Sequence, residues 1–314
     1  MGENKNLKMD NNSIVVQDKR EQIESPFKVV YKRLRKNKLA IAGLILLVVM
    51  ILFCVLGPTI YSAIKGYDCQ AFVGKKYQKP SSKFILGTDI MGRDVFLRTM
   101  VGGQKSLFVG IAAVVIQVIL GTLLGITAGY YGGIVDNIIM RIVDIFMSIP
   151  TLPLLMILAA VLSDVGFPPE MKIYMVMVII GFLAWPGLCR MIRGQVLSIR
   201  EQEYMQAADA LGIKDNRKMF KHILPNVIPV IIVSATLSLG GNILTESSLS
   251  YLGLGVVEPT PTWGNAIQAV NDLYNLKNRG WLWIPAGACI FITVMAINLF
   301  GDGLRDAIDP KLKK

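Results

Sequence analysis

Long apolar runs alternate with short polar stretches along most of this 314-residue chain. Six of the runs contain no Asp, Glu, Lys or Arg, and each is long enough to cross, or nearly cross, a hydrocarbon core of about 30 Å. They cover residues 39–64, 106–135, 145–163, 173–189, 222–245 and 281–301. The pattern therefore predicts an all-α polytopic membrane protein with six transmembrane helices.

The polar stretches between these runs divide the chain into predicted segments. Residues 1–24 are polar, mixed in charge and poor in aromatic residues, so we expect a disordered cytoplasmic tail. In residues 25–38 apolar side chains recur at helical spacing among lysines and arginines. This predicts a basic helix on the inner membrane surface, with an unstructured basic flank as the alternative. The other predicted segments are a first transmembrane helix at 39–64, an extracytoplasmic segment at 65–105, a core of five transmembrane helices at 106–302 with a cytoplasmic loop at 198–225, and a cytoplasmic C-terminus at 303–314.

Composition and charge favour a membrane protein and indicate its orientation. Hydrophobic residues make up 53% of the chain and charged residues 18%, a balance that a soluble domain of this length would struggle to hide from water. The net charge of +11 lies mainly beside the apolar runs and comes without a nucleic-acid motif, so we expect lipid headgroups as counterions. More basic residues precede the first run than closely follow it, which predicts cytoplasmic termini for a six-span chain. Residues 65–105 oppose this orientation, because they carry eight basic residues and would lie outside.

Motifs for catalysis, nucleotide binding and metal binding are absent from the sequence. There is no phosphate-binding loop of the form G-x-x-x-x-G-K-[ST], and no nucleophile and base stand at a recognised spacing. His222 is the only histidine, and the four cysteines show no metal-binding spacing. We therefore expect no catalytic residue, metal or cofactor in this chain, and if the chain takes part in active transport, the energy has to come from elsewhere.

The polar segment at 198–225 is the strongest candidate for a functional site, because it separates two apolar runs with a helical pattern. Glu203 and Ala207 fall on one helical face, with Ala208 beside them. Gly212 follows where a left-handed helix C-cap favours glycine. Adjacent alanines leave a low ridge that a cleft on another protein can contact closely. The segment is predicted to dock a cytosolic partner; a loop that merely connects two spans is the alternative.

Several residues of the apolar runs are candidates for the pore or its gate. Pro150 interrupts the third run, and the break is expected to face protein or a water-filled cavity, either as a pore-lining kink or as a simple bend. Ser238 belongs to a fifth run so rich in hydroxyl side chains that we expect it to face the bundle interior. Glu246 continues that run near its outer end and is expected to form an ion pair or reach the surface, with substrate contact as the alternative. Three glycines spaced four residues apart are predicted to pack closely against another helix: Gly121, Gly125 and Gly129.

Charged residues near the ends of the runs are predicted to have local partners. Asp215 is expected to cap a second short helix in the polar segment. Arg141 and Asp144 are three residues apart near the cytoplasmic side and are expected to pair. Three other charged residues lie within about one helical turn, namely Asp89, Arg93 and Asp94. We expect them to pair with one another or with a neighbouring chain. Contact with an arriving binding protein is the alternative.

The polar segment also resembles a known loop. The EAA loop of binding-protein-dependent ABC permeases contains Glu-Ala-Ala, a glycine soon after it and a Leu-Pro pair further on. The matching residues here, with glutamine in place of the glutamate, are Gln206, Ala207, Ala208, Gly212, Leu224 and Pro225. The stretches LGTDIMGRDVFLRTMVGGQKSL, LTESSLSYLGLGV, PTWGN and NLFGDGLRDAIDP extend the resemblance along the chain. Together they are similar to the C-type permease of the dipeptide, oligopeptide and nickel branch of type I ABC importers.

This resemblance implies the type I ABC importer permease fold and a role as half of a translocation pore for peptides. The implied partners are a homologous second permease, two ATP-binding subunits that hold ATP and magnesium, and an extracytoplasmic solute-binding protein. The residues implied to couple the permease to the ATP-binding subunits are Glu203, Ala207, Ala208, Asp209, Gly212 and Pro225. Nickel or another small solute is the alternative cargo, and a passive channel is the alternative from a different class. The implied location is the cell membrane, which the chain crosses several times.

Overall fold

A computed structural model describes residues 26–164, 166, 168 and 171–308 of the chain. The tail predicted at 1–24 and the last six residues lie outside this part. Within it, regular structure is helical, apart from one isolated antiparallel bridge between Thr88 and Asp94. The long helices are α1 (Pro26–Lys36), α2 (Lys38–Lys65), α3 (Val95–Tyr131), α4 (Gly133–Ser148), α5 (Thr151–Asp164), α6 (Lys172–Arg200), α9 (Leu224–Tyr251) and α12 (Ile284–Ile308).

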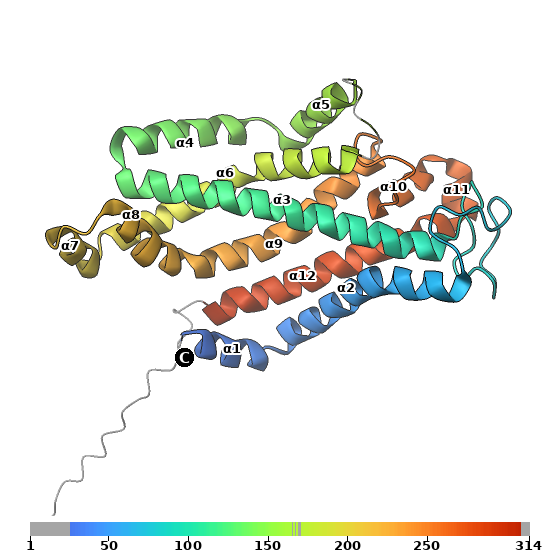
Figure 1. Ribbon diagram of the computed structural model, residues 1–314, viewed down its shortest axis with the longest axis horizontal. Helices are drawn as coiled ribbons and strands as arrows, with labels where there is room; N and C mark the ends of the chain where they lie inside the picture. Colours follow the sequence, from blue (N-terminus) through green and yellow to red (C-terminus); the bar gives the residue numbers. More distant parts are fainter. Residues whose placement is uncertain (1–25, 165, 167, 169–170, 309–314) are drawn as a thin grey trace, which may run out of the picture.

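Short helical elements lie at the two ends of the long ones. At one end are α7 (Glu203–Ala210), α8 (Asp215–Lys218) and the π-helical turn η2 (Met219–Ile223). At the other end are α10 (Trp263–Ile267), η3 (Gln268–Asn271), α11 (Leu273–Asn278) and η4 (Gly280–Leu282), together with the loop 66–94. Figure 1 shows the two groups separated by the whole length of the bundle.

Five helical stretches in the described part are long and apolar enough to cross a membrane, namely Lys38–Lys65, Val95–Tyr131, Lys172–Arg200, Asp215–Tyr251 and Ile284–Ile308. A sixth candidate is a bent pair, α4 and α5, whose axes differ by 86° across a short break. The all-α polytopic fold is therefore confirmed, with the third predicted span broken. The break lies at Ile149 and Pro150, because a proline cannot continue the hydrogen-bond ladder of a helix.

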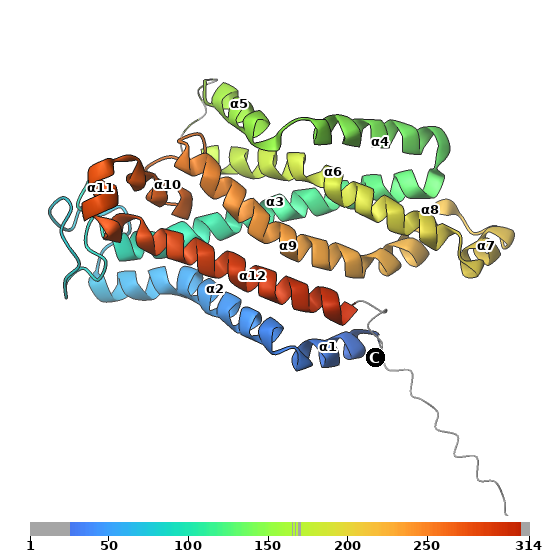
Figure 2. The ribbon, with the colours of Figure 1, turned by 180° about the vertical axis from the view of Figure 1, so that it is seen from behind.

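The long helices lie side by side in the order α4 with α5, α6, α3 and α9, α12, then α2 (Figures 1 and 2). The most extensively packed pair is α3 with α6. An added Cβ at Gly121, Gly125 or Gly129 would lie within 3.0 Å of an atom of α6. The prediction that these glycines allow close helix packing is confirmed.

Two helices extend furthest beyond the charge-free runs from which they were predicted. Helix α3 begins eleven residues early, because the Asp94 carboxylate caps its first turn by accepting from the N–H groups of Phe96 and Leu97. Helix α6 continues past Arg190 and Arg193 to Arg200. Arg190 and Arg193 are stabilised by pairing with acidic residues of the neighbouring helix α4, so these charges do not end the helix.

Those ion pairs correct one predicted contact. The Asp144 carboxylate pairs with Arg190 of α6 and not with Arg141 of its own helix. Asp136, about two turns closer to the start of α4, accepts two hydrogen bonds from the Arg193 guanidinium, at 2.9 and 2.5 Å. Pairing across two helices positions α4 along α6, which pairing within one helix would not do.

Large apolar side chains remain exposed along the sides of the bundle. On α3 they recur every four residues, at Ile111, Val115, Ile119 and Leu123, each about half exposed. Similar rows lie on α2, including Ile45, Val49 and Leu52. A protein in water would bury such surfaces, whereas a lipid bilayer solvates them.

Candidate functional site

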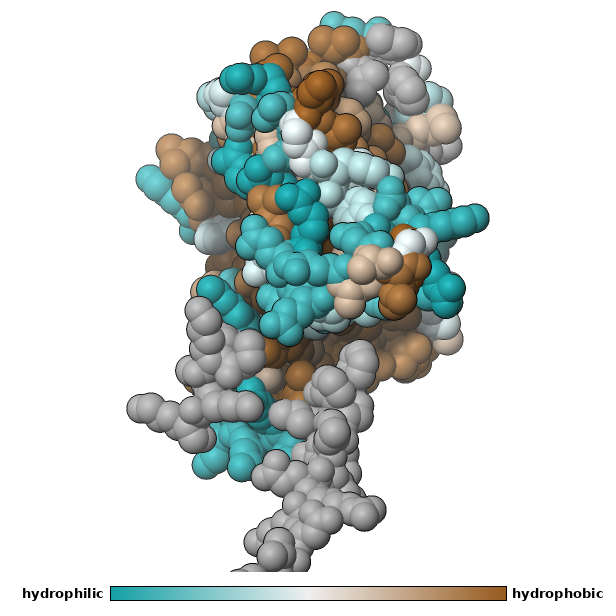
Figure 3. Space-filling view, turned by 90° about the vertical axis from the view of Figure 1, so that its left-hand side faces the viewer, coloured by the Kyte–Doolittle hydropathy of each residue, from teal (hydrophilic) through white to brown (hydrophobic). Residues whose placement is uncertain are grey.

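The polar helices α7 and α8 extend past one end of the bundle (Figures 1 and 2). Seen along the bundle from this end, hydrophilic side chains gather over the face and hydrophobic ones lie around its margins (Figure 3). The sequence predicted a docking segment here. Its position leaves α7 and α8 accessible to a partner that approaches the end of the bundle.

Helix α7 has a buried face and an exposed face. Met205 and Ala208 are buried, 1% and 5% exposed, and Met205 packs into a cluster with Ile192 of α6. Glu203 and Ala207 lie exposed, and Leu211, directly after the helix, is 79% exposed. Of the two predicted ridge alanines, Ala207 therefore offers surface to a partner, and Ala208 packs α7 onto its own chain.

Gly212 ends α7 in a left-handed conformation with φ of +66°. Its N–H donates to the Asp209 carbonyl at 3.0 Å, and the Ile213 N–H donates to the Ala208 carbonyl at 3.1 Å. This is the glycine-terminated helix end that the sequence indicates. An added Cβ at Gly212 would meet nothing within 4 Å, so the position is sterically open and demanding only in its backbone.

Lys218 joins α7 to α8. Its ammonium group pairs with Asp209, lies 3.0 Å from the Asp215 carboxylate and sits 5.4 Å from the centre of the Tyr130 ring. The Tyr130 hydroxyl donates to Asp215 at 2.6 Å. The prediction that Asp215 caps α8 is wrong, because Lys214 occupies the N-cap position and the carboxylate binds Tyr130 and Lys218 instead.

Pro225 lies in the first turn of α9, directly after the π-helical turn Met219–Ile223. A proline lacks the N–H that would bond back into the preceding turn, and a π-helical turn is one way for a helix to accommodate such a change. The structure thus places Pro225 between the polar helices and a membrane-length helix. It is exposed and is separated from α7 by α8 and η2.

Pro150 and Ser238 lie in different parts of the bundle. Pro150 is in the exposed break between α4 and α5, at the edge of the bundle. The Ser238 hydroxyl accepts a hydrogen bond of 3.1 Å from the Gln117 amide, which joins α9 to α3 inside the chain. The structure therefore does not bring the two predicted gate residues together.

Glu246 is completely buried within the chain, at 0% exposure. Its carboxylate accepts hydrogen bonds from Ser106 at 3.0 Å and Ser250 at 2.8 Å, and a longer one from Ser247 at 3.4 Å. The expected ion pair or surface position is wrong, because the carboxylate is buried and accepts from three hydroxyl groups, and no ion pair of Glu246 is found among the described residues. Ser106 also accepts from the Trp263 N–H at 3.2 Å, so the cluster ties α3, α9 and α10 together.

At the opposite end of the bundle, an ion-pair cluster joins three segments. Arg93 pairs with Asp89 at 2.6 Å and with Glu258 at 2.8 Å, and Arg98 of α3 pairs with Glu258 at 2.6 Å. Burial alone would lower the pKa of the Arg93 guanidinium, but its hydrogen bonds to Glu258 and Asp89 outweigh burial and raise it. Predicted pairing of Arg93 with Asp89 is confirmed, and Glu258 is an additional partner 165 residues away.

Asp94, the third member of that predicted group, makes no ion pair in the described part of the chain. One carboxylate oxygen caps α3, and the other accepts from the Tyr61 and Tyr67 hydroxyls at 3.0 and 2.9 Å. Burial and the hydrogen bond to Asp94 raise the pKa of the Tyr67 hydroxyl, in the loop after α2. Asp94 therefore fixes the start of α3 against α2.

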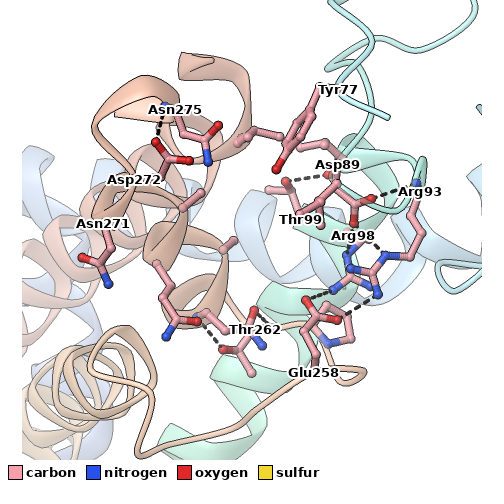
Figure 4. A pocket seen from close by; sticks show the side chains of 18 residues that line it. Tyr77, Asp89, Arg93, Arg98, Thr99, Glu258, Thr262, Asn271, Asp272 and Asn275 are labelled. Atoms are coloured by element: carbon pink, nitrogen blue, oxygen red, sulfur yellow. Dashed lines mark hydrogen bonds and ion pairs between the residues drawn. The ribbon is translucent and has the colours of Figure 1, made fainter. Parts of the chain in front are cut away.

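A cavity of about 500 Å³ opens beside this cluster. Figure 4 shows Arg93, Arg98 and Glu258 on one side of it and Asp272 and Asn275 on the other, with Tyr77 above and Thr262 below. Most of the lining residues are polar or charged, and they come from the loop 66–94, the start of α3 and the segment from α9 to α12. In the described part of the chain, no three His, Cys, Asp or Glu side chains are grouped as metal ligands.

Sequence reasoning missed several residues of these sites. Lys218 lies three residues after Asp215, so helical spacing was a usable signal for that pair. Nothing local indicates Ser106 as the partner of Glu246, because the two are 140 residues apart. The polar cavity likewise depends on segments that meet only in the folded chain.

Comparison with known proteins identifies the family. The model of the binding-protein-dependent transport system inner membrane component matches residues 121–314, well over half of the chain. The chain belongs to this family. A second model, the N-terminal transmembrane domain of oligopeptide transport permease C, matches residues 25–80, so the two models match separate stretches on either side of residues 81–120.

Curated relatives match nearly the whole permease. It is 41% identical to the oligopeptide transport system permease protein OppC of Bacillus subtilis over 284 residues, 90% of this chain and 88% of the relative. It is 38% identical to the dipeptide transport system permease protein DppC of Alkalihalophilus pseudofirmus, covering 92% of this chain and 91% of the relative. The dipeptide transport system permease protein DppC of Bacillus subtilis is 39% identical, with 90% of this chain and 85% of the relative covered.

Proposed function

We propose that this permease is one of two membrane subunits of an ATP-driven importer of dipeptides or oligopeptides. The observation that carries the cargo class is the similarity to relatives named for dipeptide and oligopeptide transport over about nine-tenths of the chain. In this proposal a homologous second permease completes the pore, two ATP-binding subunits supply ATP and magnesium, and an extracytoplasmic solute-binding protein delivers the peptide. No cofactor is held by the permease itself.

The exposed face of α7 is the proposed contact with an ATP-binding subunit. Glu203 and Ala207 offer a charged and a small side chain on one face, and Gly212 ends the helix without a projecting side chain. Asp209 acts through Lys218, and Ala208 acts by seating α7. Movement of α7 is passed through α8 and the turn before Pro225 to α9, whose other end holds Glu246.

The proposed orientation places α7 and α8 in the cytoplasm together with both termini. The cavity and the loop 66–94 are then extracytoplasmic and face the aqueous phase outside the cell membrane. The same orientation puts the basic helix α1 beside cytoplasmic lipid headgroups, to which its lysines and arginines are attracted. It also gives the two ends of the bundle different tasks, energy coupling at one and receipt of cargo at the other.

Two experiments test this function. Affinity purification of the permease from native membranes in mild detergent, followed by mass spectrometry, is expected to recover a second permease and two ATP-binding proteins. Recovery of the chain alone in several detergents would contradict the proposal and favour a passive channel, which needs no cytosolic docking helix. Reconstituted with its partners, the complex is expected to import labelled dipeptide or oligopeptide, and an excess of nickel salt is expected to leave that uptake unchanged. Competition by nickel but not by unlabelled peptides would instead support nickel as the cargo.

A further inference from the structure

The polar cavity has two chemically different walls. On one wall, Asp89 and Glu258 balance the charges of Arg93 and Arg98 through ion pairs of 2.6 to 3.6 Å. The charges of these four side chains therefore neutralise one another. A ligand gains little net charge attraction from this wall, so its specific contacts have to come from the opposite one.

On the opposite wall, polar groups are left without partners in the described part of the chain. Asp272 caps α11 through one carboxylate oxygen, which accepts from the Tyr274 N–H at 2.8 Å, and it makes no ion pair. Its second oxygen faces the cavity (Figure 4). Gln268 and Asn271 line the same wall and make no side-chain hydrogen bond within the described chain.

Asn275 completes this wall and has one end of its amide committed. Its Oδ1 accepts from the Arg279 guanidinium at 2.8 Å, which leaves Nδ2 as a donor. Arg279 itself stacks on the Tyr77 ring, 3.5 Å from its centre, and on Tyr274 at 4.8 Å. The arginine therefore connects two lining residues, Tyr77 and Asn275, and holds the Asn275 amide in place.

The exposed Asp272 carboxylate is suited to bind a cation. The neighbouring amides of Asn271 and Asn275 are suited to bind a group that both donates and accepts hydrogen bonds. The amino-terminal end of a peptide carries an ammonium group directly beside its first peptide group. A volume of about 500 Å³ is in the range of small-molecule pockets and suits a short peptide end. A protein surface would need a broader and flatter contact.

We propose that this cavity is a subsite of the permease for the amino terminus of a short peptide. Asp272 binds the ammonium group, and the amides of Asn271 and Asn275 bind the first peptide group. The inference rests on the proposed import of peptides and assigns to the permease itself a contact with free cargo. Small apolar lining residues, such as Ala266 and Ala269, leave room for the first side chain.

The test uses the complete membrane complex in lipid nanodiscs, without the solute-binding protein. Equilibrium dialysis measures binding of radiolabelled trialanine and of N-acetyl-trialanine, which lacks the ammonium charge. The unmodified peptide is expected to bind about tenfold more tightly, the usual scale of one charge-assisted hydrogen bond. Asp272→Asn is expected to reduce its binding to that of the acetylated peptide, because asparagine keeps the helix cap and loses the charge.

Two further variants separate the subsite from general damage. Asp164→Asn makes the same change at an exposed residue at the end of α5, outside the cavity, and is expected to bind both peptides as the wild type does. Asn271→Ala is expected to weaken binding of both peptides by a similar factor, because both contain the first peptide group. If Asn271→Ala weakens binding of the unmodified peptide alone, the assigned contact between Asn271 and the first peptide group is contradicted.

Several outcomes overturn the subsite. They are equal binding of the two peptides by the wild type, no binding of either at millimolar concentration, and unchanged binding of trialanine by Asp272→Asn. If Asp272→Asn instead weakens binding of the solute-binding protein to the complex and leaves trialanine binding unchanged, the cavity is a protein contact. Uptake of peptide by the complex with its solute-binding protein is measured separately, so loss of the subsite leaves the proposed import standing, and absence of uptake overturns the import itself.

Discussion

Gly212 and Glu246 are single residues in contrasting surroundings. An added side chain at Gly212 meets open space, yet the backbone there is left-handed, a conformation that costs other residues about 1 kcal/mol or more. Glu246 is enclosed on all sides and satisfied by three hydroxyl groups. Gly212 is therefore sensitive to substitution through its backbone conformation at the surface, and Glu246 through its hydrogen bonds inside the fold.

Gly212→Asp is expected to abolish transport while the chain still inserts in the membrane. The change alters the end of α7 and adds a charge to the proposed docking face. Uptake by reconstituted complexes, alongside immunodetection in membranes, measures both properties. Gly66→Asp is the matched control, because Gly66 also has a positive φ, of 75°, and open surroundings at the other end of the bundle. An equal loss in both variants would attribute the effect to backbone strain and remove the docking interpretation.

Glu246→Ala is expected to destabilise the permease by about 3 kcal/mol, since it leaves buried hydroxyl groups without an acceptor. The midpoint of thermal unfolding in detergent is expected to fall by about 6 °C or more. Glu246→Gln is expected to cause a smaller fall, because the serine hydroxyls can reorient toward the amide. Ser248→Ala removes an exposed hydroxyl that bonds only its own helix, and provides the control. A fall after Glu246→Ala no larger than this control would contradict the structural role.

At the scale of elements, α7 and α8 move as a unit only if Lys218 joins them. The two helices are short, and isolated helices of such length are unstable in water. Their order comes from Met205 and Ala208 packed beneath α7 and from the pairing of Lys218 with Asp209 and Asp215. Removal of this pairing therefore loosens the connection between α7 and α8 and leaves the packing beneath α7 in place.

Lys218→Met is expected to reduce peptide-stimulated ATP hydrolysis of the complex several-fold. Methionine keeps much of the apolar stem of lysine and removes the charge that holds Asp209 and Asp215. Lys221→Met, one turn along, changes an exposed lysine that makes no ion pair in the described chain and is expected to hydrolyse ATP as the wild type does. Wild-type activity of Lys218→Met would show that the joint is not needed for coupling.

The broken span is the second element with consequences beyond its own length. Helices α4 and α5 meet at 86°, and α4 is anchored to α6 through Asp136 and Asp144. Because these ion pairs hold α4 alone, α5 is held mainly by the packing of Leu155 and Ala159 against α6 residues such as Val176.

 Leu155 and Ala159 are both buried in this contact, at 1% and 0% exposure. Other large apolar side chains of α5 are exposed, among them Ile157 and Val161.

For the whole molecule, the separation of its two polar ends decides how it is placed in a membrane. The rows of exposed apolar side chains on α2 and α3 lie between the end with α7 and α8 and the end with the cavity. The hydrocarbon core therefore surrounds the middle of the bundle. The two ends of the bundle then lie in water on opposite sides of the membrane.

A cysteine at Lys76 is expected to react with a membrane-impermeant maleimide in intact cells, and a cysteine at Asn216 only after the cells are permeabilised. Both positions are exposed, Lys76 in the loop 66–94 and Asn216 in α8. The background carries Cys69→Ser, because Cys69 is a partly exposed native thiol at the outer end. The reverse labelling pattern would contradict cytoplasmic placement of α7 and α8 and, with it, the proposed coupling.

Much of the helical framework could be predicted from the sequence, because it depends on local patterns. Charge-free runs indicated the membrane-length helices, and Gly212 indicated the end of α7 from its position alone. Helix ends set by distant contacts were predicted less well. The arginines at the end of α6 remain helical because α4 supplies acidic partners, and no pattern within α6 contains that information.

The sequence by itself determined that this chain is an all-α membrane protein, where its apolar spans lie and that a polar helical segment separates two of them. These properties follow from composition and spacing within short stretches. Only the tertiary structure decided which alanine of α7 faces outward, that serines and not a cation satisfy Glu246, and that Asp272 faces a cavity. The physical reason is that burial and hydrogen bonding act over a few ångströms in space, and the groups that meet there include residues far apart along the chain, such as Ser106 and Glu246.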